Sequence, residues 1–138
     1  MKEIFLAGRI LLGGFFLLSG AHHFTSATAM AEQVARHGIP LPMAAVLVAG
    51  LLLIVGGVTL LLGVAPRVGV VALALFLVPV TLTMHAFWHE EGMRRAIDLV
   101  NFMKNFGLLG AVMMLVAVPE PWPYSVHARG YLRRHASV

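Results

Sequence analysis

Residues 43–64 read MAAVLVAGLLLIVGGVTLLLGV, a stretch without a single charged side chain. At a rise of 1.5 Å per residue, a helix of about 20 residues crosses a hydrocarbon core roughly 30 Å thick. Only helices and closed barrels satisfy their backbone groups within lipid, and an apolar run of this length without strict alternation indicates a helix. This stretch therefore predicts a transmembrane helix.

Three other apolar stretches have similar lengths, at residues 4–24, 68–88 and 99–118. Together with the first they predict an all-α fold, an integral membrane four-helix bundle that forms a single transmembrane domain over residues 1–138. An even number of crossings places the N- and C-termini on the same side of the membrane. The surplus of Lys and Arg on that side favours the cytoplasm.

The connecting segments complete the predicted topology. Residues 27–37 predict a short interfacial helix, and residues 119–138 form a polar, basic tail. We expect Trp122 and Tyr124 of this tail to lie among the lipid headgroups, where aromatic side chains gather. Three further residues have expected structural or interfacial roles: Arg9 reaches out to the headgroups, Arg67 lies in a tight turn, and Pro79 kinks the third span or frees a carbonyl.

Composition excludes several classes of protein. The chain is 59% hydrophobic and 12% charged, whereas a soluble domain has about a quarter of its residues charged. The net charge of +4 comes from basic residues scattered at the span ends, so nucleic-acid binding is rejected. The chain has no cysteine, which excludes disulfides and thiolate metal ligands.

Polar residues within the predicted spans fall on three helical stripes. Ionisable groups at membrane depth are costly and usually face the bundle interior or water. Spacings of three and four place side chains on one helix face, and all three stripes reach the predicted outer leaflet. The stripes comprise Ser19, His22 and His23 on the first span; Thr81, His85 and His89 on the third; and Asp98, Asn101, Lys104 and Asn105 on the fourth.

The convergence of the stripes predicts a polar pocket that opens toward the outer face. Histidine can donate, accept or carry a proton near neutral pH, and Lys104 can polarise a carbonyl oxygen. With nearby aromatic residues, this chemistry suits a quinone headgroup. The pocket is predicted to comprise His23, Thr81, His85, Trp88, Asn101, Lys104 and Asn105.

Two alternatives to a quinone pocket come from the same residues. The histidines near the span ends can lie in headgroup water while Lys104 extends outward, or the deeper residues can only lock the helices together. A metal or haem held by His85, His89 and His23 is disfavoured, because no carboxylate or cysteine completes a ligand set. No metal site is therefore predicted, and quinone is the candidate cofactor.

Several short motifs follow one another along the first 118 residues, and their order and spacing can be compared with those of known families. They are Gly8-Arg9 with Leu11-Leu12-Gly13, residues 15–20, Gly38-Ile39-Pro40, Gly56-Gly57 with Gly63 and Arg67, Thr83-x-His85-x-Phe87-Trp88, Asn101-Phe102-x-Lys104-Asn105, and Leu108-Leu109-Gly110. Over about the first 118 residues this pattern resembles the DoxX family of small four-helix membrane proteins.

The resemblance implies a multi-pass protein of a prokaryotic cytoplasmic (inner) membrane, with a role beside membrane redox chemistry. Relatives include a subunit of an archaeal thiosulfate:quinone oxidoreductase and a mycobacterial membrane partner of oxidative-stress enzymes. The residues that match the family pattern are Arg9, His85, Trp88, Asn101, Lys104 and Asn105. The chain departs from it at His22-His23, where relatives often carry Lys, and at Leu53, where they often carry Glu.

The sequence thus predicts a small membrane subunit of a quinone-linked or oxidative-stress redox complex that is not a catalyst by itself. The alternative is a non-catalytic anchor or scaffold for other proteins. The expected partners are membrane lipid, a quinone, and either partner subunits or a second copy of the chain.

Overall fold

The computed structural model describes residues 1–126, and every element in this part of the chain is helical. The elements are α1 (Lys2–Thr25), α2 (Ala27–Arg36), α3 (Pro42–Leu62), α4 (Pro66–Met84), η1 (Phe87–His89), α5 (Gly92–Met114) and η2 (Leu115–Ala117). The segments containing α1, α3, α4 and α5 are each long and apolar enough to cross a membrane. The predicted all-α bundle of four spans is confirmed.

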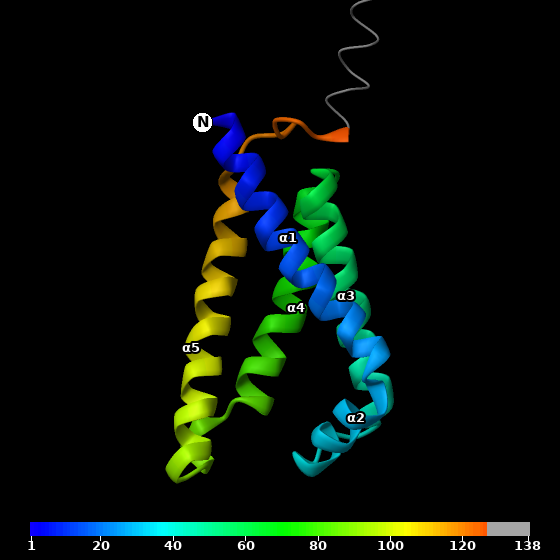
Figure 1. Cartoon of the computed structure of the whole chain (residues 1–138), viewed down its shortest axis with the longest axis vertical. Helices are drawn as coiled ribbons and strands as arrows, with labels where there is room; N and C mark the ends of the chain where they lie inside the picture. Colours follow the sequence, from blue (N-terminus) through cyan, green and yellow to red (C-terminus); the bar gives the residue numbers. More distant parts are fainter. Residues whose placement is uncertain (127–138) are drawn as a thin grey trace, which may run out of the picture.

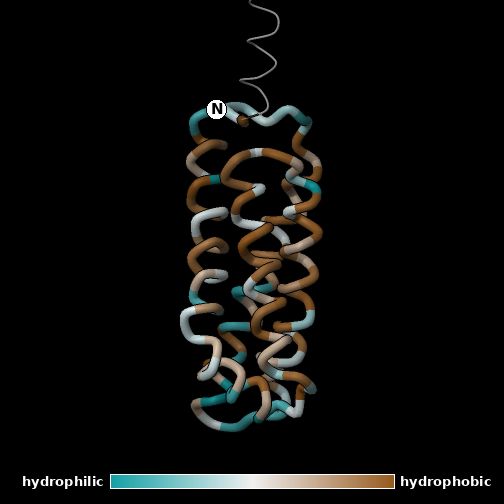
Figure 2. The backbone as a smooth tube through the Cα atoms, turned by 90° about the vertical axis from the view of Figure 1, so that its right-hand side faces the viewer, coloured by the Kyte–Doolittle hydropathy of each residue, from teal (hydrophilic) through white to brown (hydrophobic). Residues whose placement is uncertain are grey.

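Helix α3 is central to the arrangement. Helix α1 lies along α3, α3 lies along α4, and α4 lies along α5, while α2 packs against α3 at the end remote from the N-terminus. The N-terminus and residue 126 lie at the same end (Figure 1). Hydrophobic residues predominate along the four long helices, and hydrophilic residues gather at both ends of the molecule (Figure 2).

The third and fourth spans differ from their predicted bounds. Helix α4 ends at Met84 and not at residue 88, because His85 leaves helical geometry with φ −122° and ψ 37°. Helix α5 already begins at Gly92 and not at residue 99. Charged residues such as Arg94 and Arg95 resembled a loop in the sequence, yet the first turns of a membrane helix lie in the interface, where such side chains reach water.

Glycines bring α1 and α3 into close contact. A Cβ added at Gly13 would lie 2.9 Å from the carbonyl oxygen of Gly57, and one added at Gly57 would lie 2.7 Å from the backbone nitrogen of Leu17. Small residues at helix contacts allow backbones to approach and gain van der Waals contact, which is the main attraction between helices in lipid. The glycine contact therefore fixes the position of α1.

We predict that Gly13→Ala lowers the free energy of unfolding by about 1–3 kcal/mol, because the new methyl group meets backbone atoms that cannot turn aside. The adjacent Gly14 is a matched control, since a Cβ there meets nothing within 4 Å. Gly14→Ala should leave the stability unchanged or raise it by up to about 1 kcal/mol. Reversible unfolding in mixed micelles measures both variants, and equal effects would contradict the glycine contact.

Arg9 is buried inside the protein and does not reach the headgroups as the sequence predicted; its side chain is only 2% exposed. Its Nε donates to the carbonyl of Leu60 at 3.0 Å, its Nη2 to that of Leu61 at 2.8 Å, and its Nη1 to that of Pro123 at 2.6 Å. The last carbonyls of a helix have no partner within it and form the negative end of its dipole. Arg9 of α1 thus caps the end of α3.

Trp122 is also buried, which corrects the prediction that it lies among headgroups. Its side chain is 0% exposed, its ring centroid lies 5.2 Å from that of Phe5, and the Arg9 guanidinium lies 5.4 Å from its ring. Tyr124 is half exposed, and its hydrogen bond to the Glu3 carboxylate raises the pKa of the phenol. The remainder of the predicted tail, residues 127–138, lies outside the described residues.

We predict that Arg9→Met destabilises the protein by about 2–4 kcal/mol, because it leaves three carbonyls without a donor and removes the cation beneath Trp122. In a Trp88→Phe background the remaining tryptophan is Trp122, so its fluorescence should shift to the red in Arg9→Met as water reaches the ring. Thermal unfolding and emission spectra in detergent measure the two effects.

Arg67 provides the control for Arg9→Met. Its Nε lies 3.4 Å from Oε1 of Glu120, but the two side chains are 76% and 42% exposed. Exposed ion pairs contribute little to stability, so Arg67→Met should leave both the unfolding temperature and the Trp122 emission unchanged. A loss of stability as large as that of Arg9→Met would contradict the proposed capping of α3.

Candidate functional site

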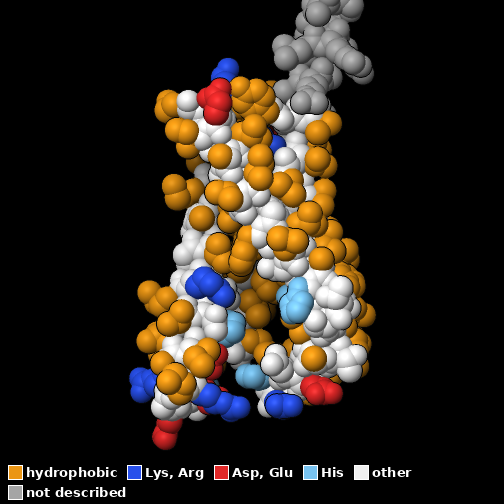
Figure 3. Space-filling view, in the orientation of Figure 1, with side chains coloured by type: hydrophobic (Ala, Val, Ile, Leu, Met, Phe, Trp, Pro, Cys, Tyr) orange, Lys and Arg blue, Asp and Glu red, His pale blue; other side chains and the backbone are white. Residues whose placement is uncertain are grey.

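A cavity of about 590 Å³ lies in the half of the molecule remote from the N-terminus. All five α-helices contribute to its walls, which are mainly apolar. Figure 3 shows a hollow on this face, with basic side chains and histidines around it. The polar residues of the lining are Ser19, His23, Gln33, Thr83, His85, Lys104 and Asn105.

The structure brings four of the seven predicted pocket residues to this cavity: His23, His85, Lys104 and Asn105. Asn101 lies next to them, because its Oδ1 accepts a hydrogen bond from Lys104 Nζ at 2.9 Å. Thr81 is buried and donates to the carbonyl of Leu77, so it stabilises α4 and does not line the cavity. Trp88 also lies outside the lining.

Trp88 belongs to an aromatic group beyond the end of α4. Its ring centroid lies 5.2 Å from that of Phe87 and 5.8 Å from that of Phe102. His89 lies beside Trp88 within the short helix η1, because α4 has already ended. The predicted stripe of Thr81, His85 and His89 on one helix is therefore wrong beyond Met84.

Lys104 lies near the middle of α5, a helix long and apolar enough to cross a membrane. Lys104 follows the start of α5 at Gly92 by twelve residues, which corresponds to roughly 18 Å along the axis, and it lies close to the midpoint of the 23-residue helix. It is exposed and also lines the cavity. An ammonium group at this depth is costly unless polar partners surround it. Its one hydrogen bond in the described structure is to Asn101.

Asn105 is the most enclosed of the polar lining residues, with 7% of its surface exposed. Within residues 1–126 its side-chain amide makes no hydrogen bond, and no fully buried polar side-chain atom in this part lacks a partner. The amide atoms are therefore accessible from the cavity. A buried amide is stable only when its donors and acceptor find partners, so Asn105 offers free hydrogen-bonding capacity to a bound molecule.

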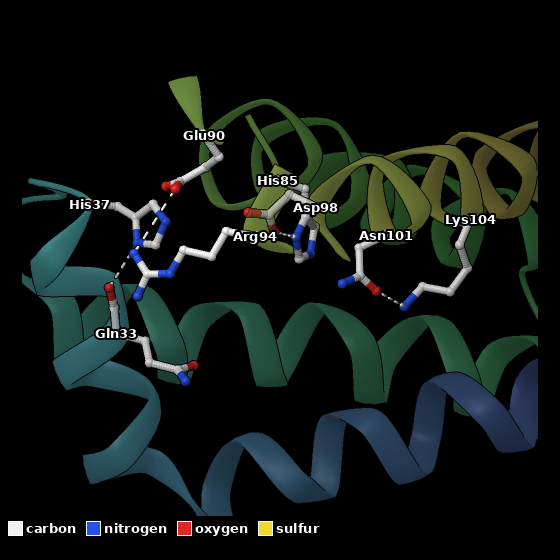
Figure 4. Close-up of polar contacts among 8 residues, drawn as sticks. All are labelled: Gln33, His37, His85, Glu90, Arg94, Asp98, Asn101 and Lys104. Carbon is white, nitrogen blue, oxygen red and sulfur yellow. Dashed lines mark hydrogen bonds and ion pairs between the residues drawn. The ribbon is translucent and has the colours of Figure 1, made fainter. Parts of the chain in front are cut away.

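His85 pairs with Asp98, a residue that the sequence analysis placed on the polar stripe of the fourth span but not in the pocket. His85 Nδ1 lies 3.2 Å from Asp98 Oδ1, and the two side chains are 23% and 20% exposed. Figure 4 shows the two residues pointing toward one another from the end of α4 and the first turns of α5. The two residues are thirteen positions apart in the sequence, so helical spacing does not predict their contact.

The partners of both lining histidines fix which ring nitrogen carries the proton. His23 Nδ1 lies 2.8 Å from the carbonyl oxygen of Ser19 and must donate to it, since a carbonyl only accepts. His85 Nδ1 donates in the same way to the Asp98 carboxylate. In a neutral imidazole this leaves Nε2 as an acceptor. The cavity therefore has histidine acceptors as well as the donors of Lys104 and Asn105.

Pro79 lies inside α4, which continues through it to Met84. Proline has no amide hydrogen, so the carbonyl of Leu75 lacks its usual donor within the helix. Leu75 and Pro79 both line the cavity, and the carbonyl of Pro79 accepts a hydrogen bond from Thr83 at 2.8 Å. No three metal-binding side chains come together anywhere in residues 1–126.

These features define a class: a small membrane protein of four spans with a mainly apolar internal cavity that contains a few polar side chains. A family model described as DoxX matches residues 4–86, which is more than half of the chain. The chain therefore belongs to the DoxX family, and it is a multi-pass protein of the prokaryotic inner membrane. The match ends at the close of α4, so Asn101, Lys104 and Asn105 lie beyond it.

One curated relative covers nearly the whole chain. This chain is 24% identical to the inner membrane protein YphA of Escherichia coli (strain K12) over 126 residues, which are 91% of this chain and 89% of the relative. No solved structure gives a significant match.

We predict that a cysteine at position 105 reacts with a small membrane-permeant maleimide although Asn105 is almost buried, because its side chain faces the cavity. The chain has no cysteine of its own, so the label reports this position alone. Val112, two turns further along the same face of α5, is 0% exposed and belongs to the core. Val112→Cys should therefore react at least about tenfold more slowly, in line with close-packed interiors. Equal rates would mean that the cavity is closed to solutes.

Proposed function

We propose that this DoxX protein binds the headgroup of a membrane quinone in the cavity, as a small subunit of a quinone-linked or oxidative-stress redox complex. One observation carries the proposal: the cavity is mainly apolar, yet it contains hydrogen-bonding groups with free capacity beside the middle of α5. Ligand sites typically combine apolar walls with a few well-placed polar groups.

The available donors fit the oxidised form of a quinone. A quinone ring has two carbonyl oxygens that accept hydrogen bonds and apolar faces that suit hydrocarbon walls. Lys104 has three N–H donors and uses one of them on Asn101, while the NH₂ group of Asn105 has two. These groups can hold and polarise a carbonyl oxygen.

The available acceptors fit the reduced form. A quinol has two hydroxyl groups that donate hydrogen bonds, and Nε2 of His23 and of His85 can accept them. Asp98 keeps the His85 ring in the tautomer that accepts, and it can stabilise the ring when a proton arrives. The chain's own residues thus bind and orient either form of the ring and hold a proton at His85 Nε2, while the transfer of electrons is assigned to a partner subunit.

An anchor for partner subunits is the alternative function, and the surface of α5 favours it. This helix is the least covered of the four spans, with large exposed apolar residues along it, such as Met103, Phe106 and Met113. A helix of a partner protein could cover this face. The two functions are compatible, and binding of quinone is the part that involves the cavity.

We predict that the purified protein in lipid nanodiscs binds ubiquinone and that Lys104→Met weakens this binding at least about tenfold, as expected when a charge-assisted hydrogen bond is lost. His85→Phe should weaken it as well. The matched controls Lys2→Met and His89→Phe change exposed residues away from the lining and should bind as the wild type does. Equilibrium quenching of tryptophan fluorescence measures the affinities.

The anchor function makes the opposite prediction for the same variants. If Lys104→Met and His85→Phe retain full quinone binding, or if the wild type binds none, then the cavity is not a quinone site. Loss of co-purifying proteins from native membranes in variants of the α5 surface, with no effect on quinone, would then favour the anchor.

A further inference from the structure

The cavity opens sideways, between α1 and α5. These two helices approach each other near the N-terminus and diverge toward the other end (Figure 1), and in the described structure neither lies along the other. Phe15 of α1 lines the cavity and is 44% exposed, and Lys104 of α5 lines it and is exposed as well. The cavity therefore reaches the molecular surface at both edges of this gap, within the membrane span.

The remote end of the molecule is a poor route for a hydrocarbon chain. Charged side chains gather there, around the tip of α2 and the segment that joins α4 to α5 (Figure 3). Glu90 and Arg94 form an ion pair at 4.0 Å, and His37 is held against the carbonyl of Gln33 at 2.9 Å (Figure 4). The sides of the bundle, in contrast, have exposed apolar residues such as Leu11 and Leu18 of α1.

The volume of the cavity limits what it can enclose. At about 590 Å³ it has the size of a site for a drug-sized molecule. A ring with its nearest substituents fits this space, but a full isoprenoid tail does not fit beside it. A long tail must leave the cavity, and hydrocarbon leaves at lowest cost through an apolar opening into lipid.

We infer that the site takes long-tailed quinones directly from the bilayer: the ring passes between α1 and α5, and the tail remains in this gap. This inference rests on the proposed function and specifies its substrate class, a membrane-dissolved quinone. The edge of the gap on α5 continues from Lys104 to Gly107 and Ala111, which follow at helical spacing and are exposed.

Two glycines of α5 allow a matched test. A Cβ added at Gly107 or at Gly110 meets nothing within 4 Å, so both sites accept a larger side chain without disturbing the fold. At about 100° per residue, Gly107 lies roughly 60° from Lys104 around α5, next to the gap, whereas Gly110 lies roughly 120° from Lys104, on the exposed face of the helix. Gly107→Phe therefore narrows the gap, and Gly110→Phe adds the same side chain elsewhere.

The experiment measures binding of two quinones with the same ring, tail-less 2,3-dimethoxy-5-methylbenzoquinone and long-tailed ubiquinone, to protein in nanodiscs. Affinities are expressed against the quinone concentration within the lipid, because the tail alone raises partition into it. We expect Gly107→Phe to weaken binding of the long-tailed quinone about tenfold, within the range of overpacking effects. Binding of the tail-less quinone should change by less than about twofold, and Gly110→Phe should alter neither.

Three other results would overturn the inference. Equal weakening of both quinones by Gly107→Phe would mean that the substitution damages the ring site, and unchanged binding of both would mean that the tail leaves elsewhere; in both cases quinone binding itself stands. No binding of either quinone to the wild type would refute the proposed function as well. Ala111→Phe, one turn further along the same edge, should repeat the effect of Gly107→Phe and replaces it if that variant does not fold.

Discussion

A single guanidinium group holds three segments of this protein together. Arg9 of α1 donates to the last carbonyls of α3 and to the carbonyl of Pro123 beyond α5, and Trp122 covers it. The last carbonyls of a helix have no partner within it, so a helix end that is shielded from water needs donors from elsewhere in the protein. The negative end of the α3 dipole in turn stabilises the buried cation, which has no carboxylate partner within residues 1–126.

The position of this contact accounts for the shape of the rest. Arg9 and the contact between Gly13 and Gly57 fasten α1 to α3 in the half of the molecule that contains both described chain ends. Helix α5 lies along α4 instead, and in the described residues α1 and α5 do not lie along one another. The cavity lies where these two helices diverge, in the half of the molecule that the Arg9 contacts do not reach.

Apolar run length was sufficient to predict four spans, because the thickness of the hydrocarbon core leaves few alternatives. Several local predictions from the same sequence were wrong. Burial of Arg9 and Trp122 depends on contacts between residues that are 51 to 117 positions apart, and helical periodicity in the sequence does not predict such contacts. The start of α5 was misplaced because Arg94, Arg95 and Asp98 resembled a loop. As a result, Lys104 was expected five residues after the start of the helix, whereas it lies twelve residues after it.

The candidate site was predictable in part. Helical spacing placed His23, His85, Lys104 and Asn105 near one another, and the structure brings them to one cavity. Helical spacing could not reveal that Asp98 orients His85. It also could not reveal that the Thr81 hydroxyl donates to a carbonyl of its own helix. The His85–Asp98 pair depends on where α4 ends and on how α5 is rotated against it, whereas the Thr81 bond depends on the side-chain conformation that Thr81 adopts within α4.

The depth of Lys104 has an electrical consequence. A respiring inner membrane maintains a voltage, and moving one elementary charge across it is worth roughly 2.3 kcal/mol per 100 mV. Because Lys104 lies near the middle of α5, a charged ligand that reaches it from either side of the membrane crosses part of that field. Binding of such a ligand is thereby coupled to the membrane voltage, whereas binding of a neutral ring is not.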